Sequence, residues 1–186
     1  MHEPWLLVHI ETIARSSSLH LYVWRALRGL GAHYMHASVC VLPESAATVE
    51  ALNRIVGRLR RRGAELRIFH VAMSTEAEHR ALVERFSAER DDEYSEVVAH
   101  TRAFLGEIEE ERRRGRAIYT VVEESQADLT RLERWLEAIR QRDHFDAPGY
   151  AEAAAAVGEC RRALAGFEAE AYSRETAGGE RPAAPP

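Results

Sequence analysis

The sequence predicts an α+β fold, in which a small sheet with two helices is followed by three long helices. Two observations lead to it. Over residues 5–74, strand-forming runs alternate with amphipathic helical runs in the order strand, helix, strand, strand, helix, strand, which is the ferredoxin-like βαββαβ arrangement. Beyond Ser74 the apolar residues recur with the period of long helices.

The first half divides into six elements where the hydrophobic period changes. Its strand runs are rich in β-branched and aromatic residues, and its helical runs begin with serines that can cap a helix and end on glycine. The expected elements are a strand at 5–11, a helix at 14–32, two strands within 32–45 that divide near Ala37 and Ser38, a helix at 45–63 and a strand at 64–74.

The second half shows three helical periods, separated by the breaks "RRRGR" and "DAPG". We expect helices over Thr75–Arg113, Tyr119–Arg142 and Tyr150–Tyr172, whose apolar faces must pack on the sheet or on one another. The expected domains are a ferredoxin-like subdomain over residues 5–74, a helical subdomain packed on it over 75–172, and a disordered tail rich in Pro, Gly and Ala over 173–186.

Composition narrows the classes of partner and compartment. The net charge of -5 gives no general attraction to nucleic acid or anionic membranes, so DNA binding would need a local basic patch. All 25 basic residues are arginine, which we attribute mainly to coding bias. Two cysteines make no disulfide framework, and "WLLVHI" is too short to span a bilayer, so we expect a cytoplasmic protein without a membrane partner.

Segments spread along the chain also show a family resemblance. They are "WLLVHI", "VWRALRGLGAHYMHASVCVLP", "RRRGAEL", "EYSEV", "LERWLEAIRQRDHFDAP" and "ECRRALAGF". Together they resemble the N-terminal domain of the chromate-resistance regulator ChrB, over most of Trp5 to Phe167. More distantly, the first half is similar to the small ferredoxin-like domains of CRISPR-adaptation nucleases and PaaX-type repressors.

The resemblance implies a bacterial cytoplasmic protein linked to chromate-responsive control of an efflux gene. It also implies that full regulators of the family carry a second, C-terminal domain, which these 186 residues do not include. A regulatory or sensor module of this kind is expected to act as a homodimer, with DNA as a candidate partner.

Polar side chains interrupt the apolar face of the first long helix. At about 100° per residue, Glu93 and His100 lie within about 20° of each other and of Leu82, and Glu96 flanks them by about 40°. Buried carboxylates are costly unless they are paired or bind a metal. One interpretation is therefore a set of inter-helix salt bridges, for which the candidate cations are Arg25, Arg28, Arg67, Arg131 and Arg142.

The other interpretation is a metal site. Glu93, Glu96 and His100 offer two oxygen ligands and an imidazole, a set that suits iron, manganese or zinc. His9 and His70 are candidate further ligands, because the first and last strands of a ferredoxin-like sheet are neighbours and could place them side by side. Glu11 and Asp143 are also candidates.

A second ligand-like run, His33-x-x-His36-x-x-x-Cys40, lies on the predicted strands. Strand alternation puts His33 and His36 on opposite faces unless a bulge intervenes, so we expect Cys40 to be a small core residue rather than a metal ligand.

Two arginine-rich runs, at 58–63 and 111–116, end predicted helices. Positive charge at a helix C-terminus complements the helix dipole, which is the simpler explanation, whereas contact with a phosphate backbone is the functional one. Neither run contains interleaved aromatic residues, and we expect Trp5, Trp24 and Trp135 to be core residues.

Three functions are left open by the sequence. The first is a regulatory or sensor module that contacts DNA. The second is a small metal- or cofactor-dependent enzyme with a Glu/His site in the crevice between sheet and helices. The third is a protein that binds a small oxyanion through arginines.

Overall fold

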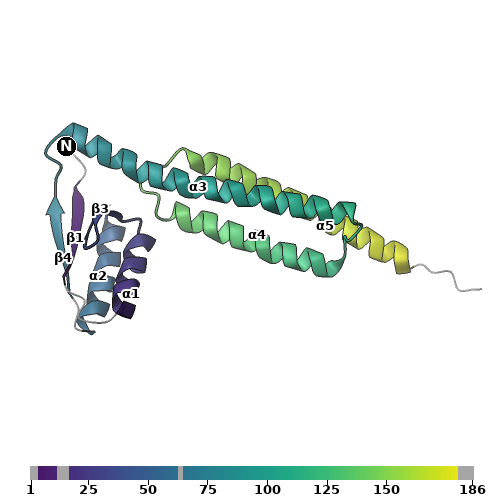
Figure 1. Cartoon of the computed structure of the whole chain (residues 1–186), viewed down its shortest axis with the longest axis horizontal. Helices are drawn as coiled ribbons and strands as arrows, with labels where there is room; N and C mark the ends of the chain where they lie inside the picture. The colour runs from purple at the N-terminus through teal and green to yellow at the C-terminus, as the bar shows by residue number, and fades with distance from the viewer. Residues whose placement is uncertain (1–3, 12–16, 63–64, 180–186) are drawn as a thin grey trace, which may run out of the picture. The chain divides into compact units, whose positions relative to one another are not determined.

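The computed structural model describes residues 4–11, 17–62 and 65–179, and the chain folds into two compact units (Figure 1). Unit 1 consists of the residues up to Arg90 together with Gln141–Ala147. Unit 2 consists of Asp91–Arg140 together with the residues from Pro148 onward. The first long helix therefore contributes its first turns to unit 1 and the rest to unit 2.

Unit 1 has a mixed α/β architecture, and the predicted order of its elements is confirmed. Its four strands form an antiparallel sheet in the order β2-β3-β1-β4, so the first and last strands are neighbours as expected. The elements are β1 (Trp5–Glu11), α1 (Ser17–Gly29), β2 (His33–His36), β3 (Val39–Pro43), α2 (Ala46–Arg60) and β4 (Glu65–Val71).

The two faces of the sheet bury different partners because successive strand side chains point to opposite sides. Alternate residues of β1 enter the core that α1 and α2 cover (Figure 1). Its members on β1, α1 and α2 are Leu6, Val8, Ile10, Leu19, Val23, Leu27, Leu52, Ile55 and Leu59. Fully burying a side chain of this size contributes roughly 1.5–3 kcal/mol.

The opposite face of the sheet packs on the beginning of α3 (Glu76–Arg113). Trp5 and Val41 of the sheet form a cluster there with Leu82 and Phe86 of α3. The Trp5 and Phe86 ring centroids lie 5.4 Å apart. This packing explains why unit 1 extends beyond the sheet to Arg90.

Unit 2 is built from the remainder of α3, α4 (Tyr119–Arg140) and α5 (Gly149–Gly179). The helical spacing predicted for α4 and α5 is confirmed by their buried faces, although Leu136 of α4 is partly exposed. Residues 173–179, expected to lie in the tail, continue α5 as helix, and 180–186 lie outside the described residues. The buried residues of α4 and α5 include Leu129, Leu132, Ile139, Val157, Cys160, Leu164 and Phe167.

Two glycines with positive φ end helices. Gly31 follows α1 with φ 79°, and a Cβ there would lie 2.5 Å from the Arg142 carbonyl oxygen, so only glycine allows this close approach. Gly115 follows α3 with φ 70° and begins the short link to α4.

No helix among the described residues is long and apolar enough to cross a membrane.

Candidate functional site

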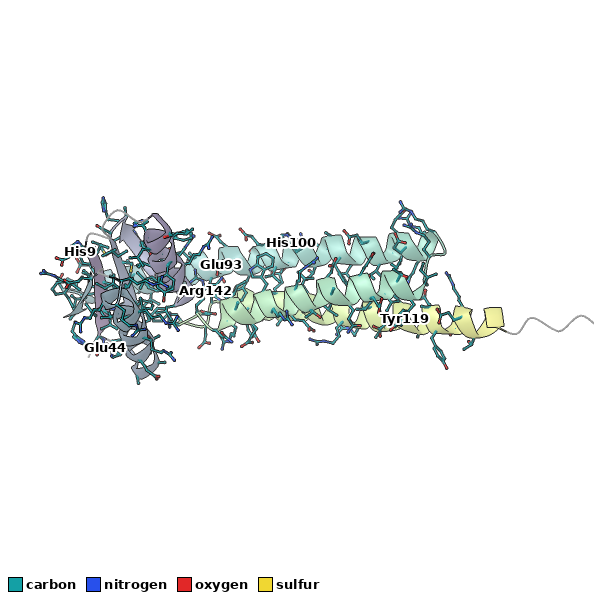
Figure 2. The ribbon with its side chains drawn as sticks, turned by 90° about the horizontal axis from the view of Figure 1, so that it is seen from below. His9, Glu44, Glu93, His100, Tyr119 and Arg142 are labelled. Carbon is teal, nitrogen blue, oxygen red and sulfur yellow. The ribbon has the colours of Figure 1, made fainter. Side chains whose placement is uncertain are left out.

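The polar side chains of α3 lie at the edge of its buried face. Glu93 is partly buried, but Glu96 and His100 are exposed. The prediction that Glu96 and His100 lie on the buried face of this helix is therefore wrong. The buried arc in unit 2 is centred near Tyr94 and Thr101, which sequence inspection missed as core residues. His100 is the residue before Thr101, so it lies about 100° from Thr101 around the helix and faces outward (Figure 2).

His100 lines a shallow cavity of about 380 Å³ between α3 and α4. Its Nδ1–H donates to the Glu96 carbonyl oxygen at 2.9 Å, which leaves Nε2 as the free ring nitrogen. Its ring meets Trp135 edge-on, with centroids 5.0 Å apart. Arg131, one of the predicted counter-charges, also lines the cavity and pairs with Asp128 on its own helix.

The two strand histidines do not lie side by side, which corrects the prediction. In the register of β1 and β4, His9 is opposite Arg67 and Leu6 is opposite His70. Since directly opposed residues share a face and neighbours along a strand alternate, His9 and His70 project from opposite faces of the sheet. His70 Nδ1 lies 2.9 Å from a carboxylate oxygen of Glu44.

Two further candidates for the metal shell have other partners. Glu11 forms an ion pair with Arg67 at 2.7 Å. The Asp143 carboxylate accepts the backbone N–H of Ala147 at 3.1 Å. Among the residues that the structure describes, no three His, Cys, Asp or Glu side chains gather so as to hold a metal ion. A metal centre made of Glu93, Glu96, His100, His9 and His70, and the enzyme it would serve, stay predictions.

The three residues of the His33-x-x-His36-x-x-x-Cys40 run have different surroundings in the structure. A register shift interrupts the pairing of β2 and β3 between Tyr34 and His36. His33 Nδ1 lies 2.6 Å from a carboxylate oxygen of Glu89 on α3. Cys40 is fully buried in the core, as predicted, and burial raises the pKa of its thiol to about 12.

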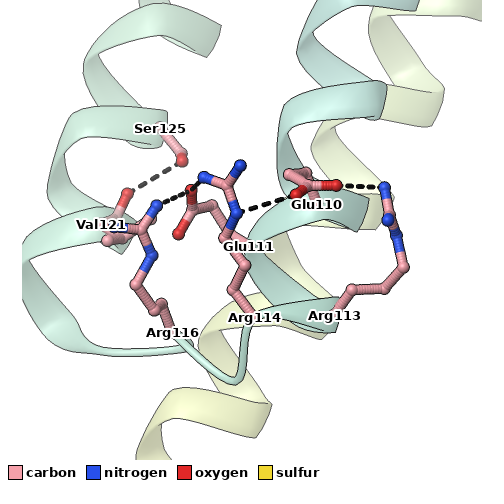
Figure 3. Close-up of polar contacts among 7 residues, drawn as sticks. All are labelled: Glu110, Glu111, Arg113, Arg114, Arg116, Val121 and Ser125. Atoms are coloured by element: carbon pink, nitrogen blue, oxygen red, sulfur yellow. Dashed lines mark hydrogen bonds and ion pairs between the residues drawn. The ribbon is translucent and has the colours of Figure 1, made fainter.

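Arginines of the second arginine-rich run are neutralised by Glu110 and Glu111, at the start of the run (Figure 3). Glu110 pairs with Arg113 and, at 2.8 Å, with Arg114. Glu111 pairs with Arg114 at 3.6 Å and with Arg116. These contacts favour the structural explanation of this run, a set of paired charges at the C-terminus of α3.

The first arginine-rich run has a different environment. It ends α2 and continues to Arg62, and α1 beside it carries Arg25 and Arg28 and no acidic residue. Among the described residues, Arg25, Arg28, Arg58 and Arg62 form no ion pair with a carboxylate, and all four are exposed.

Aromatic rings lie among these arginines, although none is present in the run itself. Arg58 Nη1 donates to the Tyr22 hydroxyl at 3.4 Å, and the guanidinium carbon of Arg62 lies 5.7 Å from the centroid of the Tyr22 ring. On α1 the guanidinium carbon of Arg28 lies 4.8 Å from the Trp24 centroid. Such distances allow cation–π attraction. Trp24 is 38% exposed, so its assignment to the core is wrong.

We call this group the α1–α2 surface, defined as Tyr22, Trp24, Arg25, Arg28, Arg58 and Arg62. Sequence inspection missed it because Tyr22 and Arg58 are 36 residues apart and meet only when both helices pack on the sheet. The available indication was the absence of acidic residues from α1.

Comparison with known proteins bears on the family of the chain. No curated protein matches it. A family model described as "Protein ChrB, N-terminal" matches residues 20–178. The matched range is most of the chain and includes every residue of the α1–α2 surface. The chain therefore belongs to the ChrB N-terminal family, a family associated with chromate resistance.

Proposed function

We propose that the chain is a regulatory module in chromate resistance that binds the DNA backbone through the α1–α2 surface. The observation that carries the proposal is a group of four exposed arginines without carboxylate partners, in a chain whose net charge is -5. Unpaired positive charges on two neighbouring helices create a local positive potential, which attracts an anionic partner even though the chain is acidic overall.

Arginine suits this task because its planar guanidinium donates two parallel hydrogen bonds to a phosphate. The contacts of Tyr22 with Arg58 and Arg62, and of Trp24 with Arg28, hold three of these long side chains in place. An ordered side chain loses less conformational entropy when it binds, so the rings favour binding in addition to their own contacts.

We also infer that unit 1 is a ferredoxin-like domain. The element order and the position of β1 between β3 and β4 support this inference. In this arrangement α1 and α2 cover the same face of the sheet, which is what brings the α2 arginines beside Tyr22. A homodimer and an oxyanion ligand stay predictions.

The proposal is tested by fluorescence anisotropy with a labelled DNA duplex from the region upstream of the protein's own gene. We expect Arg58→Gln together with Arg62→Gln to weaken binding at least tenfold, because a charge-assisted hydrogen bond contributes about 1.5–3 kcal/mol.

The matched control is Arg113→Gln together with Arg114→Gln, which removes the same charge from arginines that are already paired. The DNA affinity of this control should stay within about twofold of that of the unaltered chain, because its two arginines already have carboxylate partners. The proposal fails if the unaltered chain does not bind the duplex, or if both double variants lose affinity equally.

A further inference from the structure

A pocket of about 760 Å³ lies between α4 and α5 in unit 2. None of its lining residues belongs to the α1–α2 surface. Pockets of roughly 300–1,000 Å³ are typical of small-molecule sites. Its floor is apolar, because Val122 and Ala171 line it and are 8% and 5% exposed.

Aromatic rings and carboxylates surround this floor. Tyr119 of α4 and Tyr172 of α5 line the pocket and are 63% and 71% exposed, which is unusual for side chains of this size (Figure 2 labels Tyr119). Three further lining residues are Glu123, Glu168 and Glu175.

The three carboxylates have no cationic partner among the described residues, and no arginine lines the pocket. Carboxylates alone would be an ordinary solvated helix surface. Here they accompany an apolar floor and two exposed rings, whose negative faces also attract cations. The combination disfavours an anionic ligand and favours an organic cation.

The spacing of the carboxylates selects the shape of that cation. Glu168 and Glu175 are seven residues apart on α5, which places them about 10.5 Å apart along the helix axis. A single metal ion needs its oxygen ligands within about 2–2.6 Å, and no such group of ligands is found among the described residues. An extended molecule with several positive charges matches the separation.

We propose that this pocket binds a linear polyamine, with ammonium groups at Glu123, Glu168 and Glu175 and the methylene chain on the floor formed by Val122 and Ala171. Tyr119 and Tyr172, which also line the pocket, flank the chain in this arrangement. The site is independent of the proposed DNA surface, because it uses residues of unit 2 only.

The test is isothermal titration calorimetry of the full chain with spermidine at low ionic strength, without DNA. We expect saturable one-to-one binding to the unaltered chain. Glu123→Gln should weaken it roughly tenfold, whereas Glu124→Gln, the exposed neighbour on the same helix that does not line the pocket, should change it less than twofold.

The rings give a second comparison. Tyr172→Ala should weaken spermidine binding severalfold, and Tyr172→Phe should retain it, because the ring face is kept and the hydroxyl is lost. Circular dichroism of each variant verifies that the helices are intact.

Three results would overturn the proposal: absence of saturable spermidine binding, equal losses in the Glu123 and Glu124 variants, or magnesium chloride binding with the affinity of spermidine. None of them bears on DNA binding through α1 and α2, so failure here and failure of the proposed function are distinguishable.

Discussion

Asp91 begins the acidic stretch Asp91–His100, and its carboxylate has a structural task. Its Oδ1 accepts the backbone N–H of Gly149 at 2.7 Å. Gly149 is the first residue of α5, where backbone N–H groups lack partners within the helix. A Cβ on Gly149 would lie 2.8 Å from the same oxygen, so a larger residue at position 149 would displace this carboxylate.

Replacing this acceptor should destabilise unit 2. We expect Asp91→Ala to lower the free energy of unfolding by about 1–2 kcal/mol, the usual effect of losing a side-chain cap. Asp92→Ala is the matched control, because Asp92 is exposed, and it should change stability by less than about 0.5 kcal/mol. Urea unfolding followed by circular dichroism measures both, and equal effects would contradict the capping role.

Tyr34 is a second residue whose surroundings set a measurable property. Its hydroxyl is buried and has no hydrogen-bond partner among the described residues. Burial, with a smaller contribution from nearby Cys40, raises the pKa of Tyr34 from 10.0 to about 12. Burial likewise raises the pKa of Cys40 from 9.0 to about 12.

These two shifts predict an alkaline loss of stability. Both groups are neutral below their pKa, and in the unfolded chain they ionise from about pH 9 and 10, whereas in the folded chain they stay neutral to about 12. Stability should therefore be complete below pH 9 and fall between pH 9 and 12. Tyr34→Phe should reduce that fall and, by removing an unpaired hydroxyl, should not lower stability at pH 7.

Thermal unfolding at pH 7, 9 and 10.5 checks this expectation. An equally steep alkaline fall in Tyr34→Phe, or a marked loss of stability at pH 7, would show that the hydroxyl has a favourable partner in the fold.

At the scale of elements, local sequence determined most of the secondary structure. Alternation along Trp5–Glu11 and the glycine after α1 are local features; β1 has its predicted bounds, and α1 forms within the predicted range. The buried face of α3 was harder to predict. Tyr94 and Thr101 are polar enough to suggest exposed positions, whereas His100 lies at nearly the same angle around the helix as the buried Leu82. Which side of a long helix is buried depends on its neighbours, and in this case two units use different parts of it.

The two arginine-rich runs show the same limit for function. Glu110 and Arg114 are four residues apart, so their pairing is predictable from the sequence. Tyr22 and Arg58 meet through tertiary packing alone. The sequence therefore indicates which arginine-rich run is neutralised but does not reveal the aromatic rings beside the other run. It also does not reveal that His9 and His70 project from opposite faces of the sheet.

The helices of unit 2 are held by their buried side chains more than by surface ion pairs. Phe167 of α5 is fully buried, and Phe69 of β4 is 46% exposed. We expect Phe167→Ala to cost about 3–5 kcal/mol, and Phe69→Ala less than about 1 kcal/mol. Hydrogen exchange should show faster exchange within unit 2 for the first variant.

Similar losses in the two phenylalanine variants would contradict this account of the core.

The ion pair between Arg161 of α5 and Glu133 of α4, at 2.6 Å, is exposed at the arginine and should contribute only about 0.2–1 kcal/mol to stability.

At the scale of the whole molecule, charge separates the two units. The described residues of unit 1 include ten acidic residues and twelve arginines, and those of unit 2 include eighteen and eleven. The chain's net charge of -5 therefore conceals a slightly basic unit that carries the α1–α2 surface and an acidic unit that carries the α4–α5 pocket. An anionic and a cationic ligand are the partners that this separation favours.

The salt dependence of DNA binding tests the central claim most directly. Each phosphate neutralised by the protein contributes about 0.9 to the slope of the logarithm of the binding constant against that of salt concentration. We predict that Arg58→Gln with Arg62→Gln reduces the magnitude of this slope by about 2, while Arg113→Gln with Arg114→Gln leaves it unchanged. A slope that does not change in the first double variant, or that changes equally in both, would contradict DNA binding through the α1–α2 surface.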